Sequence, residues 1–261
     1  MNIDENRLKY VAVTDSGAGG LAVMRKIKKE FPRLNLLYVS DCAAVPYGNK
    51  SCEEIKERAK NNCDIAVKNG AAAIVVACNT MSLTAEKTIK NFGLPCFFVR
   101  PDETEITKQS KLCGGKVALF CTEASAKSGA ICRLSNICSC FIQPQIALAS
   151  EVENAFKESN PLNVKSKLEN CIPEITCPNR LDYVFLGCTH YIFLKNTFKK
   201  LFPGAKLRDG SESVCEFVKQ TVKSFSLEDN ENLLVCGKTR FLGSGSTDMK
   251  NAFDLIGKIL I

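Results

Sequence analysis

One local pattern of residues occurs twice in this chain and predicts its architecture. Residues 74–79 and residues 184–189 each consist of three apolar residues, one small residue, a cysteine and a small polar residue. A short apolar, partly β-branched run predicts a buried strand. Two such units far apart in one chain predict two similar α/β halves. Ligands of parallel α/β sheets bind beyond the carboxyl ends of the strands, and Cys78 and Cys188 fall at such ends.

The rest of the chain alternates between predicted strands and predicted helices. Apolar runs predict strands over residues 10–14, 34–39, 95–99, 116–120, 140–143, 205–209 and 232–236. Helical patterns predict helices over residues 21–31, 52–69, 151–157, 165–170, 193–201, 214–225 and 250–260. Ser51 is the predicted N-cap of the helix over residues 52–69. Because the sequence shows no low-complexity linker, we expect the two halves to abut directly.

The chain is rich in cysteine but has a single histidine, His190. The 15 cysteines are odd in number and show no regular spacing, so a disulfide scaffold is not expected. Cys132, Cys138 and Cys140 are close in sequence, but the chain has no Cys-x-x-Cys pair and His190 lies far from them. We therefore expect no metal site, and we expect most of the thiols to be small core residues.

Composition and charge are those of an ordinary globular protein. The 261 residues are 45% hydrophobic and 24% charged, and the net charge of +7 is spread along the chain. Tryptophan is absent, and no basic stretch is interleaved with aromatic residues, so nucleic-acid binding is not expected. The N-terminus has no apolar signal region, and runs such as 71–78 are too short to span a bilayer. We expect a cytoplasmic protein without a membrane partner.

A glycine-rich turn follows the first predicted strand. Gly17-x-Gly19-x-x-Ala22, with Asp41 downstream, is similar to a dinucleotide-binding fingerprint. Asp15 would place negative charge where a pyrophosphate must approach. We therefore expect no nucleotide cofactor at this turn.

Two cysteines that face one cleft have three plausible uses. A redox pair is usually Cys-x-x-Cys, and a metal site needs more ligands than Cys78, Cys188 and His190, although a further carboxylate ligand stays possible. Two thiols opposed across a carbon atom can instead remove a proton from one face and return one to the other. That reaction inverts a stereocentre, and Asp15 and His190 would set which thiol is deprotonated.

Four linked motifs resemble, in order, those of the glutamate racemase family, which belongs to the cofactor-independent aspartate/glutamate racemase superfamily. The motifs are Asp15-Ser16-Gly17-x-Gly19-Gly20-Leu21, Pro46-Tyr47-Gly48-x-Lys50-Ser51, Ala77-Cys78-Asn79-Thr80 and Gly187-Cys188-Thr189-His190-Tyr191. The resemblance implies two similar three-layer α/β domains in pseudo-symmetric arrangement, with the active site in the cleft between them. It implies a first domain of residues 1–96 and 207–261 and a second domain of residues 97–206.

The resemblance also implies the chemistry and the site. Cys78 would take the proton from D-glutamate, and Cys188, assisted by His190, would take it from L-glutamate, without a cofactor. The implied catalytic residues are Cys78, Cys188, His190 and Asp15. The implied substrate-binding residues are Asp15, Ser16, Tyr47, Gly48, Asn79, Thr80, Thr122, Glu151, Thr189 and His190. Ser125 would take the second place of a Thr-x-x-Thr turn that begins at Thr122. The product would supply peptidoglycan synthesis, and a homodimer is expected.

The chain departs from the family pattern at three places. Ile192 stands where proline is usual, Arg100-Pro101 replaces a glycine-containing turn, and Thr14 replaces an apolar residue. These changes affect how the following helix begins and the shape of the cleft, and not the expected chemistry. Two other functions stay open: a racemase of aspartate or another amino acid, and a non-catalytic protein that binds an amino acid.

Overall fold

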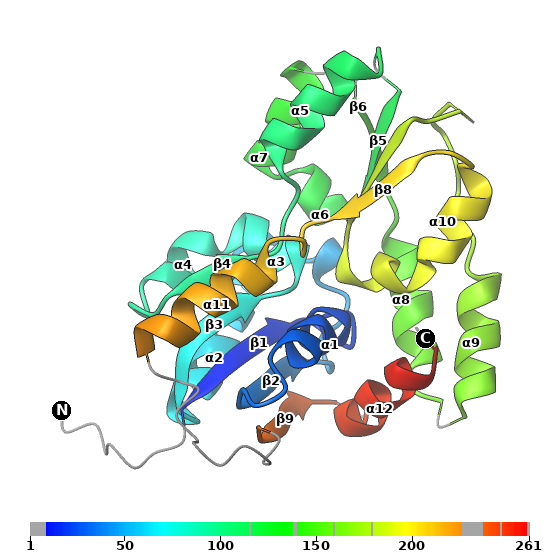
Figure 1. Cartoon of the computed structure of the whole chain (residues 1–261). Coiled ribbons are helices and arrows are strands. Elements are labelled where there is room, and N and C mark those ends of the chain that lie inside the picture. The colour runs from blue at the N-terminus through cyan, green and yellow to red at the C-terminus, as the bar shows by residue number, and fades with distance from the viewer. Residues whose placement is uncertain are drawn as a thin grey trace.

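The computed structural model describes residues 9–114, 116–137, 140–158, 160–178, 180–225, 237–245 and 247–259. Within these ranges the strands form two separate parallel sheets, each covered by helices on both faces (Figure 1). The expected fold class, two three-layer α/β halves, is confirmed.

The first sheet has the strand order β4-β3-β1-β2-β9. Its strands are β1 (Tyr10–Asp15), β2 (Leu36–Asp41), β3 (Ala71–Val76), β4 (Cys96–Phe98) and β9 (Thr239–Ser244). Alternate residues of β1 face opposite layers. Val11 and Val13 pack towards α1 (Leu21–Glu30), α11 (Val214–Phe225) and α12 (Met249–Ile259). Ala12 faces α2 (Cys52–Lys68) on the other side. The same side carries η1 (Tyr47–Asn49), α3 (Asn79–Thr84) and α4 (Glu86–Lys90).

The second sheet has the strand order β6-β5-β7-β8. Its strands are β5 (Val117–Cys121), β6 (Cys140–Pro144), β7 (Tyr183–Gly187) and β8 (Lys206–Asp209). One face packs on α5 (Glu103–Leu112), α6 (Glu123–Ala126) and α7 (Gly129–Ile137). The other face packs on α8 (Ile146–Ala155), α9 (Pro161–Asn170), the 3₁₀ helix η2 (Thr189–Leu194) and α10 (Lys195–Leu201).

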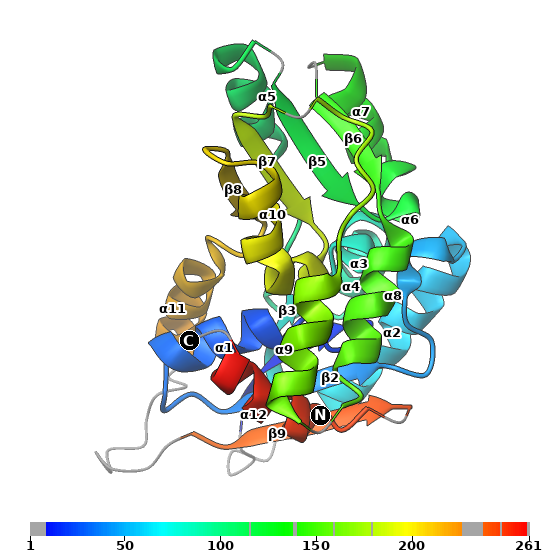
Figure 2. The same cartoon turned by 90° about the vertical axis from the view of Figure 1, so that its right-hand side faces the viewer.

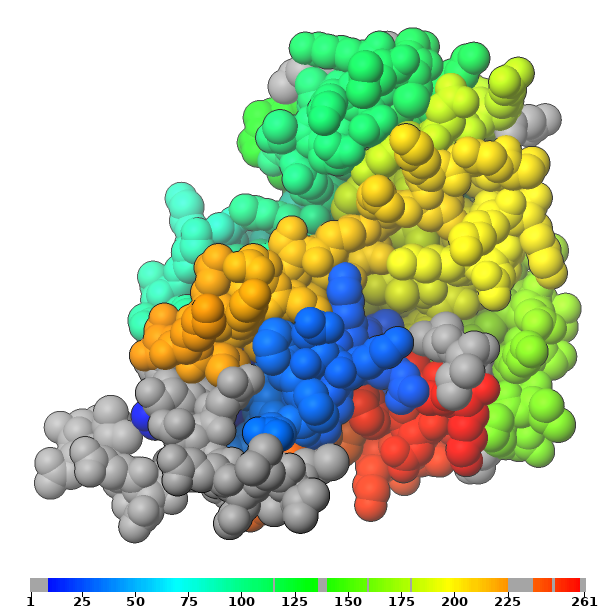
Figure 3. All heavy atoms as spheres, in the orientation of Figure 1, coloured from blue at the N-terminus to red at the C-terminus, as the bar shows by residue number. Residues whose placement is uncertain are grey.

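The two halves abut, as expected. One continuous cluster of buried apolar side chains contains Val11 and Val13 of the first sheet together with Ala118 and Phe120 of the second. The C-terminal helix α12 lies beside α9 (Figure 2). Figure 3 shows the boundary of the halves from outside, where yellow atoms of the second half lie against blue atoms of the first half. Here η2 contacts α1.

The chain passes between the sheets twice, after β4 and after β8. The expected boundaries after residues 96 and 206 fall inside these strands. All of β4 belongs to the first sheet and all of β8 belongs to the second, so the second crossing follows Asp209. The domain limits themselves stay a prediction.

Several predicted elements are confirmed and others need revision. Ser51 caps α2, because its Oγ accepts the Glu54 N–H at 3.2 Å. The helix expected from residue 165 begins at Pro161, because Asn160 caps it. The helix expected from residue 193 begins as 3₁₀ helix η2. The strand predicted over residues 232–236 lies outside the described residues, and the edge strand β9 was not predicted. Among the described helices, none has the length and apolar character to cross a bilayer.

Candidate active site

The two predicted thiols occupy equivalent places in the two sheets. Cys78 follows β3 and is the N-cap residue of α3, and Cys188 follows β7 and is the N-cap residue of η2. Both side chains are buried, with exposed fractions of 5% and 7%. Negative charge on Cys188 contributes to raising the pKa of Cys78, so the two sulfur atoms belong to one electrostatic site.

Cys78 is linked to a carboxylate through a hydroxyl. Its Sγ lies 3.8 Å from Ser16 Oγ, which in turn donates a hydrogen bond to Asp15 Oδ1 at 3.4 Å. Burial and then the charge of Asp15 raise the pKa of Cys78. Burial also raises the pKa of Asp15. Hydrogen bonds from the Met81 N–H and Ser16 lower the pKa only in part, so this thiol is favoured in the protonated form.

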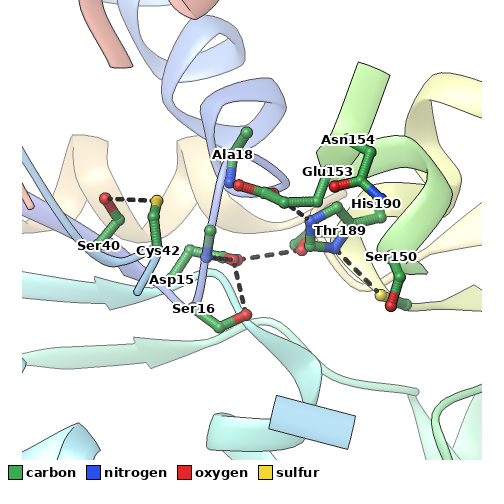
Figure 4. Close-up of polar contacts among 12 residues, drawn as sticks. Asp15, Ser16, Ala18, Ser40, Cys42, Ser150, Glu153, Asn154, Thr189 and His190 are labelled. Atoms are coloured by element: carbon green, nitrogen blue, oxygen red, sulfur yellow. Dashed lines mark hydrogen bonds and ion pairs between the residues drawn. The ribbon is translucent and has the colours of Figure 1, made fainter. Parts of the chain in front are cut away.

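Cys188 is linked to a carboxylate through the only histidine. Its Sγ lies 3.6 Å from His190 Nδ1, and His190 Nε2 lies 2.9 Å from Glu153 Oε2 (Figure 4). Burial lowers the pKa of His190, but the bonds to Cys188 and Glu153 outweigh it and the pKa is raised. Burial raises the pKa of Glu153, but His190 outweighs it and the pKa is lowered. The pair is thus an imidazolium and a carboxylate, and the cation stabilises negative charge on Cys188.

Glu153 replaces Glu151 as the acidic residue of this site. Glu151 is exposed, and it interacts with Cys171 instead. Side chains two positions apart in an α-helix point in directions about 200° apart around its axis, because one turn takes about 3.6 residues. Glu151, a predicted substrate-binding residue, therefore lies on the opposite side of α8 from Glu153. Glu153 lies four residues after the buried Ala149 and so falls on the apolar face of α8. A carboxylate on that face is the sequence signal that could have identified it.

The carboxylates of the two halves are held by each other's loops. Thr189 of the second half donates to Asp15 Oδ2 at 3.0 Å. Reciprocally, the Ala18 N–H of the first half donates to Glu153 Oε2 at 2.8 Å. Figure 4 shows both bonds crossing the boundary between the halves. The bond that each carboxylate makes across the boundary therefore forms only when the halves are together. Glu153 Oε1 is buried and has no hydrogen-bond partner among the described residues.

The glycine-rich turn is the surface on which the second half packs. A Cβ added to Gly17 would lie 2.5 Å from Glu153 Oε2, and one added to Gly19 would lie 2.3 Å from Thr189 Oγ1. Real side chains do not tolerate such distances, so these positions require glycine. The fingerprint-like spacing thus has a packing reason, which needs no pyrophosphate.

Three buried hydroxyls form a second contact between the halves. Thr80 of α3 lies 2.8 Å from Thr122 and 3.1 Å from Ser125, and Thr122 lies 2.9 Å from Ser125. Gly48 packs against Thr122, whose Cβ would lie 2.6 Å from an added Cβ. Predicted residues of the second and third motifs and of the turn that begins at Thr122 are thus brought into one region.

Two further predicted residues differ in their polar contacts. The Tyr47 hydroxyl donates a hydrogen bond to Asp41 Oδ2 at 2.9 Å, so its proton already has an acceptor within the protein. Asn79 Oδ1 is buried and has no hydrogen-bond partner among the described residues. A buried acceptor without a partner is costly, so it is suited to a donor that a ligand brings.

A third thiol lies close to the carboxylates. Cys42 follows β2, and its Sγ lies 3.5 Å from Ser40 Oγ (Figure 4). Burial and the charges of Glu153 and Asp15 raise the pKa of Cys42 to about 12. This thiol stays protonated at neutral pH and is not a candidate base. Cys42 was not among the residues predicted from the sequence.

The cysteines considered for a metal do not form a site in the described part of the chain. Cys132 is exposed on α7 and Cys140 is half-buried on β6, whereas Cys138 lies outside the described residues. Among the residues that the structure describes, no group of three or more histidine, cysteine, aspartate or glutamate side chains has a geometry able to hold a metal ion.

Comparison with known proteins gives a consistent result. No protein-family model matches the chain. The glutamate racemase of Sulfurihydrogenibium sp. is 30% identical over 266 residues, covering 96% of this chain and 93% of that protein. The glutamate racemase of Persephonella marina is 30% identical over 80% of this chain and 81% of that protein. That of Pseudomonas aeruginosa (strain UCBPP-PA14) is 34% identical over 74% of this chain and 73% of that protein.

Solved structures agree with these relatives. The glutamate racemase of Thermus thermophilus, solved with β-chloro-D-alanine, superimposes with a TM-score of 0.72 and 28% identity, covering 98% of this chain and 95% of that chain. That of Aquifex pyrophilus gives a TM-score of 0.62 at 28% identity, covering 97% and 94%. From its sequence, its two-sheet architecture and its paired thiols, this chain belongs to the glutamate racemase family.

Proposed function

We propose that this protein interconverts L- and D-glutamate by proton transfer between two thiols, without a cofactor. The observation that carries the proposal is the pair Cys78 and Cys188, which end equivalent strands of two sheets and are each linked to a buried carboxylate. A protein that only bound an amino acid would not need two thiols so arranged.

The charges on the two sides suggest the direction of proton transfer. In this proposal Cys188 acts first as the base, because the imidazolium of His190 lies beside its sulfur, and Cys78 is the proton donor. With L-glutamate, Cys188 removes the Cα proton and the C–H electron pair stays on the substrate as a carbanion. Cys78 then donates its proton to the opposite face, and its S–H electron pair stays on sulfur. The product is D-glutamate, and the next turnover in this direction requires proton exchange.

The polar groups around the thiols match the groups of the substrate. Asp15 and Asn79 Oδ1 are acceptors suited to the ammonium group. Ser16, Thr80, Thr122, Thr189 and the backbone of Gly48 are suited to the two carboxylates. His190 and Glu153 serve Cys188, and Ser125 supports Thr80 and Thr122. Because these groups are buried, the halves must separate for substrate to enter.

Incubation of the purified protein with L-glutamate in ²H₂O, without added cofactor, tests the proposal. Optical rotation should decay to zero while deuterium appears at the α-carbon. Cys78→Ala and Cys188→Ala should abolish the decay. L-Aspartate in a parallel reaction tests the rival substrate, and racemisation of aspartate alone would overturn the assignment to glutamate.

The biological setting is a further part of the proposal. Membership of the glutamate racemase family supports a role in supplying D-glutamate for peptidoglycan, in the cytoplasm and as a homodimer. The mass of the protein in solution, by light scattering, tests the dimer directly.

A further inference from the structure

A buried asparagine lies behind the catalytic turn, on the α2 side of the first sheet. Asn62 is on α2, whose buried face is otherwise made of Ile55, Ala59, Cys63 and Ala66. Its exposed fraction is 3%. An amide in such surroundings is costly to bury unless it is hydrogen-bonded. Its contacts therefore show what it does.

The amide of Asn62 is bonded to the end of β1. Its Nδ2 donates to Thr14 Oγ1 at 3.2 Å and to the main-chain oxygen of Asp15 at 3.4 Å. Thr14 is fully buried and points to the α2 side of the sheet, as Ala12 does. One side chain thus holds both the last interior residue of the strand and the carbonyl that begins the catalytic turn.

This carbonyl determines where the catalytic turn lies. Its direction fixes the plane of the Asp15–Ser16 peptide, because a peptide unit is rigid. From that plane Ser16 Oγ reaches both Asp15 Oδ1 at 3.4 Å and Cys78 Sγ at 3.8 Å. Tyr38 holds the next part of the turn, since its hydroxyl donates to Gly17 O at 2.6 Å. The carbonyl groups of the turn are thus held from β2 and from α2, and Asn62 holds the one nearest the Asp15 side chain.

We propose that Asn62, with Thr14, is a positioning residue that aims Asp15 and Ser16 at Cys78. The proposal rests on the proposed function for the role of Cys78. Among the described residues, the Asn62 amide donates hydrogen bonds to Thr14 and to the main chain of Asp15, and to neither thiol. Its effect on catalysis is thus transmitted through the backbone.

The test compares Asn62→Leu, Thr14→Val and the double variant T14V/N62L. Each single change leaves a buried polar group without its partner and should lower Tm by roughly 2–8 °C. The double variant removes the polar side chains from both positions, so its Tm should recover most of the loss. Asn61→Leu, at the exposed neighbouring position of α2, is the matched control and should leave kcat unchanged.

Activity separates positioning from mere support of the fold. We expect kcat to fall by roughly 10- to 100-fold in Asn62→Leu, since small displacements of catalytic groups have effects of this size. We expect it to stay low in T14V/N62L, because the carbonyl of Asp15 still has no donor from α2. If the double variant regains both Tm and kcat, or if Asn62→Leu loses Tm alone, the proposal is overturned.

A second measurement does not depend on racemase activity. Iodoacetamide reacts with the thiolate, so the pH at which Cys78 is alkylated at half its maximal rate reports its surroundings. Mass spectrometry of the Cys78 peptide distinguishes it from the other cysteines. A displaced Asp15 should move this pH downward in Asn62→Leu and in the double variant, and an unchanged value overturns the proposal. If the wild type fails to racemise glutamate, the proposed function fails, and the alkylation still decides the role of Asn62.

Discussion

Nε2 of His190 lies 2.9 Å from Oε2 of Glu153, and both side chains are buried. The same carboxylate oxygen also accepts the Ala18 N–H from the other half. Glu153 therefore positions the imidazolium beside Cys188 and also forms a hydrogen bond that joins the two halves at the site.

The first prediction concerns Glu153→Gln. The amide keeps the shape of the side chain but loses its charge, so the imidazolium is less favoured and the Cys188 thiolate is stabilised less. We expect kcat/KM to fall at least about 10-fold, given that general acid–base groups contribute about 10²- to 10⁴-fold. Glu151→Gln, on the exposed side of the same helix, should keep wild-type kinetics. The assignment is wrong if the two variants behave in the opposite way.

The sequence predicted the thiols because their signal is local. A strand, a small residue and a cysteine place Cys78 and Cys188 at strand ends whatever the rest of the fold does. Glu153 was missed because its orientation depends on which side of α8 faces His190. A shift of two residues along the helix points the side chain to the opposite side. The partner of Asp15 was also missed, since Thr189 was assigned to the substrate and the contact forms only when the halves meet.

The remaining differences in the fold have the same origin. The edge strand β9 has a charged residue and a glycine within six residues, and it is defined by pairing with β2. Its own sequence has no clear strand pattern. Asn62 likewise resembles its exposed neighbour Asn61 in sequence, and only the packing of α2 on β1 distinguishes the two.

A second prediction concerns the packing of the halves at Gly17. Gly17→Ala places a methyl carbon 2.5 Å from Glu153 Oε2, which is too close for atoms that are not bonded, so Glu153 must move away from His190 and Ala18. We expect kcat to fall strongly while the far-ultraviolet circular dichroism stays that of the wild type. Gly129→Ala is the control, because its added Cβ has only Arg133 Nη1 nearby, at 3.7 Å. Equal activity in Gly17→Ala and the wild type would show that this contact is not needed.

The buried pair also predicts how stability depends on pH. Glu153 has a lowered pKa when folded, so its contribution is present above its unfolded pKa of about 4.3 and is lost as the pH falls through the folded value. His190 has a raised pKa when folded, so its contribution is complete below about 6.5 and is lost as the pH rises through the folded value. The pair should therefore stabilise most between about pH 4.3 and 6.5.

Urea unfolding of the wild type and Glu153→Gln across pH measures this directly. The difference in unfolding free energy should be roughly 3 kcal/mol inside that window, as for other buried ion pairs that lose one partner. It should shrink at both lower and higher pH. A difference that does not vary with pH would mean that the pair is not ionised in the folded protein.

The last prediction concerns His190 and is constrained by symmetry. The equilibrium constant of a racemisation is one, so kcat/KM must be equal for the two enantiomers in any variant. His190→Asn removes the cation beside Cys188 and must lower kcat/KM equally in both directions. The asymmetry appears instead in which proton transfer limits the rate. Because transfer to Cys188 is slowed, the primary isotope effect with α-deuterated L-glutamate should rise relative to that with α-deuterated D-glutamate. A slowed variant with an unchanged ratio of the two isotope effects would mean that His190 orients the substrate and does not serve Cys188.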